Sequence, residues 1–75
     1  MLKNELIREL SEMRIPHDSY SIDFEKNESI CLMNDGMLWV VFYSERGQKT
    51  EPKYFVDEEE ACDNFFSRLK VMLGI

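Results

Sequence analysis

Glycine, proline and long apolar runs are scarce in this sequence, and each scarcity excludes a class of protein. Three glycines and two prolines in 75 residues exclude a collagen-like segment or a flexible linker. The longest apolar run, Met37–Tyr43, has seven residues, whereas a membrane-spanning helix needs about 20. The first residues also lack the unbroken apolar stretch of a secretory signal. We therefore expect a cytoplasmic protein that does not bind a membrane.

Cysteine and histidine are equally scarce. A disulfide scaffold would have about four cysteines or more, and this chain has only Cys31 and Cys62. The two do not form a CxxC pair, and the single histidine, His17, is distant from both in sequence. They supply at most three of the four ligands that a structural zinc site needs. We expect two reduced, mostly buried thiols, no metal site and no cofactor.

Positive charge is in the minority, with nine Lys and Arg against 15 Asp and Glu and a net charge of -6. Nucleic acids and anionic membranes attract an excess of Lys and Arg, so neither is expected as a main ligand. A hydrophobic fraction of 44% is high enough for a folded chain. The length predicts one small domain, residues 1–75.

The period of the apolar residues changes along the chain and predicts the secondary structure. Leucines at a spacing of four, from Leu2 to Leu10, indicate a first helix that ends before Pro16. Alternation over residues 20–25 then predicts a strand, and a turn follows at residues 26–28. Residues 29–33 and 37–43 are expected as strands around an Asn-Asp-Gly hairpin turn. A turn at residues 45–48 precedes a fourth strand within residues 49–56, which Pro52 restricts to an edge.

The last helix begins after residue 56. Asp57 is expected as its N-cap and Glu60 as the third position of a capping box. Seven apolar residues then fill one continuous arc of the helix: Ala61, Cys62, Phe65, Phe66, Leu69, Met72 and Leu73. The prediction is an α+β domain of order α-β-β-β-β-α, in which a four-stranded antiparallel meander lies between an N-terminal and a C-terminal helix.

Catalytic patterns are missing. Nucleophilic catalysis needs an imidazole base, and His17 lies in an expected surface connection. The acidic residues Glu58–Glu60 are consecutive, so they fan around a helix and do not converge. No phosphate-binding or nucleophile-elbow motif is present. We therefore expect that the protein is not an enzyme. The alternative, a small enzyme using acidic residues, would require a carboxylate of perturbed pKa in a concave site.

The strand expected at residues 37–43 is apolar on both faces, whereas a sheet covered on one face only should alternate. The helices could cover opposite faces, or a curled sheet could wrap the first helix. Otherwise one aromatic-bearing face is partly open and meets a partner, with Trp39 and Tyr43 as anchors. Acidic residues around it, Glu45, Glu58 and Glu59, would then suit a basic protein such as a nuclease. Arg46 either pairs with a nearby carboxylate or meets the partner.

Five short segments resemble small bacterial immunity proteins of polymorphic-toxin and contact-dependent growth inhibition systems. They are Tyr20-Ser21-Ile22, Cys31-Leu32, Gly36-x-x-Trp39-x-Val41-x-Tyr43, Glu45-Arg46-Gly47-x-Lys49 and Phe55-x-x-Glu58-x-x-Ala61-Cys62. The resemblance implies a non-enzymatic protein that binds the C-terminal domain of a cognate toxin and occludes its active site. The alternative function is a homodimeric interaction or regulatory module, in which the open sheet face pairs with a second copy.

Overall fold

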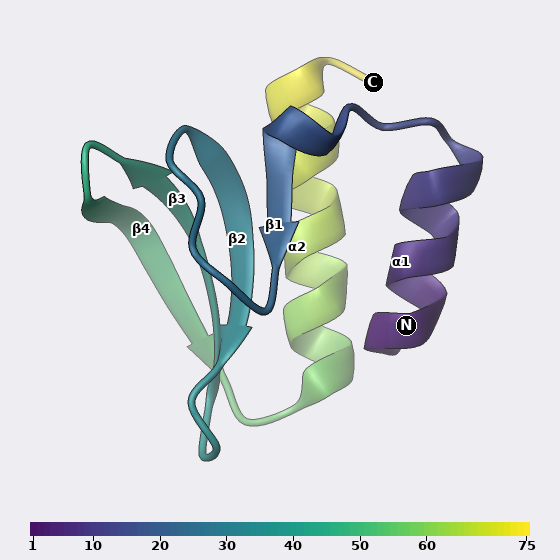
Figure 1. Ribbon diagram of the computed structural model, residues 1–75. Coiled ribbons are helices and arrows are strands. Elements are labelled where there is room, and N and C mark those ends of the chain that lie inside the picture. Colours follow the sequence, from purple (N-terminus) through teal and green to yellow (C-terminus); the bar gives the residue numbers. More distant parts are fainter.

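Two helices and four strands make up the fold, and the computed structural model describes residues 1–75. In chain order the elements are α1 (Lys3–Glu12), the 3-10 turn η1 (His17–Ser19), β1 (Tyr20–Ile22), β2 (Ser29–Asn34), β3 (Trp39–Glu45), β4 (Gln48–Phe55) and α2 (Glu58–Leu73). Both helices lie on one side of the sheet (Figure 1). The predicted α+β class and the number of helices and strands are confirmed.

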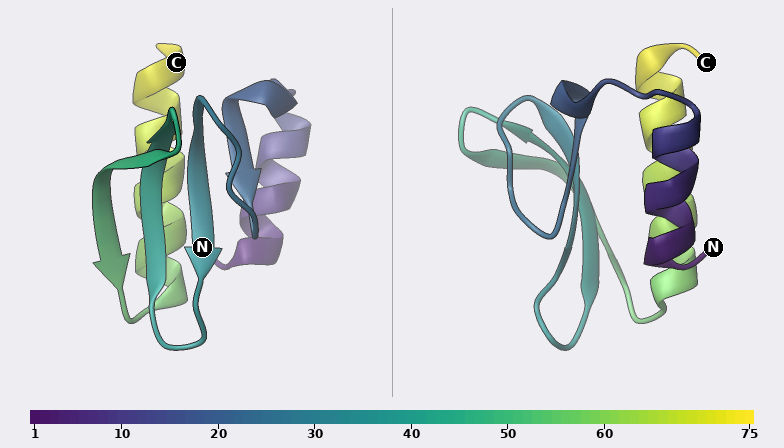
Figure 2. Two further views of the ribbon diagram at one scale, coloured as in Figure 1. Left: turned by 60° about the vertical axis from the view of Figure 1, so that its left-hand side comes forward. Right: turned by 45° about the vertical axis from the view of Figure 1, so that its right-hand side comes forward.

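The strands are adjacent in the order β1-β2-β3-β4, and one pair differs from the predicted meander. β2 pairs with β3, and β3 with β4, in antiparallel fashion. β1 instead runs parallel to β2, with Tyr20 opposite Ile30 and Ile22 opposite Leu32. The prediction of a purely antiparallel sheet is therefore wrong for this pair. Residues 23–28, called the strap below, carry the chain back along the sheet on the side away from the helices (Figure 2).

The shortness of β1 explains why a parallel pair needs no crossover helix. Its three residues extend for about 10 Å, and six extended residues reach roughly 20 Å. Asp23 and Glu28, at the two ends of the strap, have positive φ angles of 78° and 59°, which turn the chain at each end. Alternation of apolar and polar residues does not encode strand direction, so the sequence pattern could not distinguish the two arrangements.

The ends of both helices follow local sequence signals. α1 ends at Glu12, shortly before Pro16. Asp57 is the N-cap of α2, as predicted, and its side chain accepts a hydrogen bond from the Glu59 backbone N–H at 3.1 Å. Glu60 makes no reciprocal bond, so the expected capping box is not formed. Neither helix is long and apolar enough to cross a membrane.

The core lies between the helices and the sheet. Its ten buried residues come from α1, α2, the two central strands and the connection after α1: Leu6, Leu10, Ile15, Ile30, Leu32, Val41, Ala61, Cys62, Phe65 and Leu69. The apolar arc predicted for α2 thus supplies four of them. Cys31 and Cys62 are both free and fully buried, which confirms the prediction of buried thiols.

The strap explains why β3 is apolar on both faces. Trp39, Val41 and Tyr43 pack against the core on the helix side, so Val40 and Phe42 point to the other side of the sheet. Phe42 and its register partner Cys31 have no exposed surface, although no helix covers that side (Figure 2). Cys31 lies against the strap, with its Sγ 3.6 Å from the Lys26 carbonyl oxygen, and the Phe42 ring lies under the Lys49 ammonium, which pairs with Glu25 of the strap. Of the arrangements expected from the sequence, the one with helices on opposite faces is wrong.

Candidate functional site

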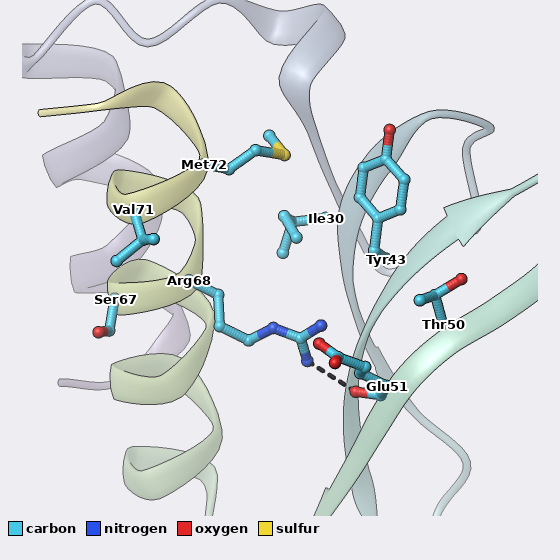
Figure 3. Close-up of a pocket in the computed structure, with 8 residues that line it drawn as sticks. All are labelled: Ile30, Tyr43, Thr50, Glu51, Ser67, Arg68, Val71 and Met72. Atoms are coloured by element: carbon cyan, nitrogen blue, oxygen red, sulfur yellow. Dashed lines mark hydrogen bonds between the residues drawn. The ribbon is translucent and has the colours of Figure 1, made fainter.

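A cleft opens between the C-terminal half of α2 and strands β2 to β4 (Figure 3). Its volume is about 520 Å³. Eight residues line it: Ile30, Tyr43, Thr50, Glu51, Ser67, Arg68, Val71 and Met72. Tyr43 is the one lining residue that the sequence predicted as a partner anchor. The cleft is the largest hollow of the molecule and forms the candidate site.

The upper part of the cleft is apolar. Met72 extends from α2 toward Ile30 and Tyr43, which stand on the facing strands (Figure 3). Ile30 is buried and Tyr43 half-buried, whereas Val71 is 79% exposed. An aliphatic side chain that is this exposed on a helix beside a hollow leaves apolar surface available to a partner.

The lower part of the cleft is polar and depends on a β-bulge. Val41 is opposite Lys53 and Tyr43 is opposite Thr50, so that two residues of β4, Glu51 and Pro52, stand across from one residue of β3. Glu51 has a positive φ angle of 50°. Pro52 has no backbone N–H to donate to the ladder. The bulge therefore interrupts the pairing of β3 with β4 at the foot of the cleft.

Arg68 bridges this interruption. Its Nη1 atom donates hydrogen bonds to the carbonyl oxygens of Val41, at 3.1 Å, and of Glu51, at 3.0 Å. Arg68 borders the apolar arc of α2, three residues after Phe65 and four before Met72, and its side chain is half-buried. A charged residue at the edge of a helix's apolar arc was the available sequence signal, but Arg68 was not among the residues predicted from the sequence.

The cleft continues into the turn between β3 and β4. A second hollow of about 290 Å³ is lined by Glu45, Arg46, Gln48 and Thr50, and it shares Thr50 with the cleft. Arg46 and Gly47 have φ angles of 52° and 78°, as in a type I′ hairpin turn. Glu45 and Arg46 are both exposed, and neither forms an ion pair. The expected pairing of Arg46 with a neighbouring carboxylate is wrong.

The six residues predicted to bind a partner lie at two opposite ends of the sheet. Tyr43, Glu45 and Arg46 belong to the cleft and the adjoining turn. Trp39 stands at the other end of β3, opposite Phe55, and Glu58 and Glu59 begin α2 at the same end (Figure 1). The structure thus brings three of the six together with the cleft and leaves the other three apart.

Trp39 is half-buried and packs against the core on the helix side. Tyr43 faces the same side. The helices cover most of the face that carries these two rings, and the part of it beside Tyr43 stays open as the cleft. Instead, a row of partly exposed apolar side chains crosses the opposite face, where Met33 stands beside Val40 and Val40 beside Tyr54. Tyr54 was not among the residues predicted from the sequence.

Glu58 and Glu59 have partners within the chain. Glu58 Oε2 accepts a hydrogen bond from the Lys3 backbone N–H at 2.8 Å, in a partly buried position. The Met1 amino group lies 2.8 Å from Asp63 and 3.9 Å from Glu59, and the hydrogen bond to Asp63 raises the pKa of that amino group above its usual value. The acidic start of α2 therefore anchors the first turn of α1.

The cleft combines an apolar wall with a few polar groups. It contains hydroxyl groups, one guanidinium and one carboxylate around an apolar wall, without His or Cys. No three His, Cys, Asp or Glu side chains lie close enough to share a metal ion. Asp35 lies apart from the cleft in the β2–β3 turn, where hydrogen bonds from the Leu38 and Met37 backbone N–H groups lower the pKa of its carboxyl.

Such a site can accommodate an apolar side chain and offers polar atoms at its edges. No protein-family model, curated protein or solved structure matches this chain.

Proposed function

We propose that the protein is a non-catalytic inhibitor that binds a basic partner protein through the cleft and the β3–β4 turn. The partner is the C-terminal domain of a bacterial toxin, and binding blocks its active site without turnover. One observation carries the proposal: the cleft of about 520 Å³ has exposed apolar residues at its mouth and continues into a charged turn. The resemblance to small immunity proteins supports the identity of the partner.

The apolar wall supplies the affinity in this proposal. Burying an aliphatic side chain such as Val71 or Met72 contributes about 1.5–3 kcal/mol, and interface energy concentrates on a few central residues. Val71 is 79% exposed and Met72 41% exposed in the free protein, so most of Val71 and part of Met72 remain to be buried by a partner.

Charge supplies the selectivity. The chain has a net charge of -6, and the carboxylates of Glu45 and Glu51 beside the cleft have no ion-pair partner within the chain. The net negative charge would steer a basic partner toward the protein as a whole, because Arg46 and Arg68 balance the two carboxylates at the cleft itself. A protein that cleaves nucleic acid has a basic substrate groove, and an acidic inhibitor would occupy the place of the phosphates.

Co-expression tests the proposal. The C-terminal domain of the protein encoded immediately upstream would be produced in a bacterium with and without this chain, and a pull-down would follow. We expect growth arrest that this chain relieves by forming a stable complex. The proposal would be contradicted if the upstream domain does not arrest growth, or if the arrest persists and no complex forms.

Two matched variants test the location of the interface. Val71→Asp places a charge at the mouth of the cleft and should abolish rescue, with at least about a thirtyfold loss of affinity. Val56→Asp is the control, because Val56 is 83% exposed and lies in the connection between β4 and α2, away from the cleft. If both variants rescue equally well, the cleft is not the interface.

A homodimeric module is the alternative function, and the row Met33–Val40–Tyr54 favours it. This row contains no charged residue, so two copies could meet there without repulsion between like charges in spite of the net charge of -6. Light scattering over a range of protein concentrations distinguishes the two functions. A dimer that Tyr54→Glu converts to a monomer would support the homodimer, and a monomer at every concentration would exclude it.

A further inference from the structure

Polar contacts, and little apolar burial, hold the strap on the sheet. Three buried serines of the sheet donate hydroxyl hydrogen bonds to it: Ser21 to the Phe24 carbonyl, Ser29 to the Lys26 carbonyl and Ser44 to the Glu25 carboxylate. No residue of the strap belongs to the hydrophobic core, and Phe24, its one apolar side chain, is 59% exposed. Segments with few apolar contacts open at lower free energy than the core.

The strap is also joined to the turn between β3 and β4. Asn27 Oδ1 accepts a hydrogen bond from the Arg46 backbone N–H at 2.8 Å, and Glu25 lies 3.5 Å from Lys49 in an ion pair. The Glu28 backbone N–H donates to the Ser44 carbonyl at 2.6 Å. These contacts fix the turn from the side away from the helices.

Cys31 lies beneath the strap. Its Sγ is 3.6 Å from the Lys26 carbonyl oxygen, and its side chain has no exposed surface. Cys62 is equally buried, but it belongs to the core between the helices and the sheet. The two thiols thus report on the two sides of the sheet.

We propose that the strap is a latch that opens as a local unit while the core remains folded. In this opening the strap moves away from the sheet about its two ends, where Asp23 and Glu28 turn the chain with positive φ angles. Opening exposes the Cys31 thiol and releases the turn that carries Glu45 and Arg46. The proposal concerns the free protein and does not depend on the proposed toxin partner.

Thiol labelling under native conditions tests the latch. The whole protein would be treated with iodoacetamide without denaturant, and mass spectrometry of peptides would follow the alkylation of Cys31 and Cys62 separately. We expect Cys31 to react at least about tenfold faster than Cys62, because only Cys62 requires the core to unfold. Equal rates for the two thiols would show that only global unfolding exposes them, and would overturn the proposal.

Two variants identify the route by which Cys31 becomes exposed. Asn27→Ala removes the bond to Arg46 and should speed labelling of Cys31 by about fivefold, which corresponds to the net contribution of one hydrogen bond, without changing Cys62. Leu10→Ala, in the core, should speed the labelling of Cys62 without changing the labelling rate of Cys31. An unchanged Cys31 rate in Asn27→Ala would overturn the latch, even if Cys31 reacts faster than Cys62.

Amide exchange gives a second readout. The Arg46 N–H is bonded to the Asn27 side chain, so it should exchange through the same opening that exposes Cys31. In a Glu25→Gln variant, the exchange rate of this amide and the labelling rate of Cys31 should therefore rise by the same factor. Glu9→Gln, on the exposed side of α1, is the control and should change neither rate. Different factors for the Arg46 amide and the Cys31 thiol would show that the strap and the turn do not move together.

Discussion

Arg68 donates a hydrogen bond from Nη1 to the carbonyl oxygen of Glu51, 3.0 Å away, and thereby ties α2 to β4. The same nitrogen reaches the Val41 carbonyl on β3. A single side chain of the helix thus holds two strands together at the bulge. The cleft owes its lower boundary to this contact, so its shape and the stability of the fold depend on the same residue.

Replacing Arg68 with Met should lower the free energy of unfolding by about 1–2 kcal/mol, because the partly buried Val41 carbonyl and the exposed Glu51 carbonyl both lose their donor. Arg68→Lys should recover part of this loss, since the lysine ammonium is also a donor but lacks the planar geometry. Urea denaturation measures the effect. Arg8→Met, at an exposed position of α1, is the control. Equal stability of the Arg68 and Arg8 variants would contradict the bridging role.

Trp39→Ala should destabilise the isolated protein by about 2 kcal/mol, less than the value for a fully buried ring, because Trp39 is only half-buried against the core. Tyr54→Ala, on the opposite face and 58% exposed, should cost less than about 1 kcal/mol. Urea denaturation compares the two. Unchanged stability of Trp39→Ala with weakened partner binding would instead make Trp39 an interface residue.

Glu58→Ala should loosen the first turn of α1, because the Lys3 backbone N–H then loses its carboxylate acceptor. We expect a loss of about 1 kcal/mol and faster hydrogen exchange at the Lys3 amide. Glu60→Ala is the matched control, since Glu60 is also an acidic residue of the first turn of α2 but is exposed. If both variants exchange alike at Lys3, the contact does not anchor α1.

The raised pKa of the Cys62 thiol predicts that the folded protein loses stability at alkaline pH. Burial, and secondarily the negative charge of Glu58, raises the pKa of this thiol from 9.0 to about 11. In the unfolded chain the thiol ionises first, so its contribution to stability is complete below pH 9 and disappears as the pH rises through 11. The total change is about 2–3 kcal/mol.

Urea denaturation at several pH values above 8 measures this dependence against a Cys62→Ala variant. The variant loses stability at every pH through its smaller core side chain, but it should show a weaker decline between pH 9 and 11. Cys31→Ala keeps the Cys62 thiol and should keep the steeper decline. Parallel declines of Cys62→Ala and the unchanged protein would contradict the raised pKa.

Local signals in the sequence were sufficient for most of the fold. The spacing of Leu6 and Leu10, the N-cap Asp57 and the turn at residues 45–48 each depend on signals within a few residues, and each was predicted correctly. The direction of β1 was not predictable, because it depends on the path of the strap over Cys31 and Phe42. That path is fixed by bonds from buried serines, whose sequence positions resemble any polar position of a strand.

The candidate site was predicted in part. Tyr43, Glu45 and Arg46 lie at the cleft, but the opposite half of its lining comes from the C-terminal part of α2. Val71 and Met72 line the cleft because the C-terminal end of α2 extends past the core. The spacing of apolar residues along a helix does not show which of them the sheet covers. Trp39 was assigned to an open face because alternation defines two faces but not which one the helices cover.

The bond between Lys3 and Glu58 joins residues 55 positions apart in the chain, and this separation has a consequence during synthesis. A ribosome delivers α1 first, yet the acceptor for its first turn and the buried residues of α2 emerge last. Until then Leu6 and Leu10 have no complete core to enter. The nascent chain therefore carries an undocked amphipathic segment for most of its translation, and the domain closes only when its two sequence-distant helices meet.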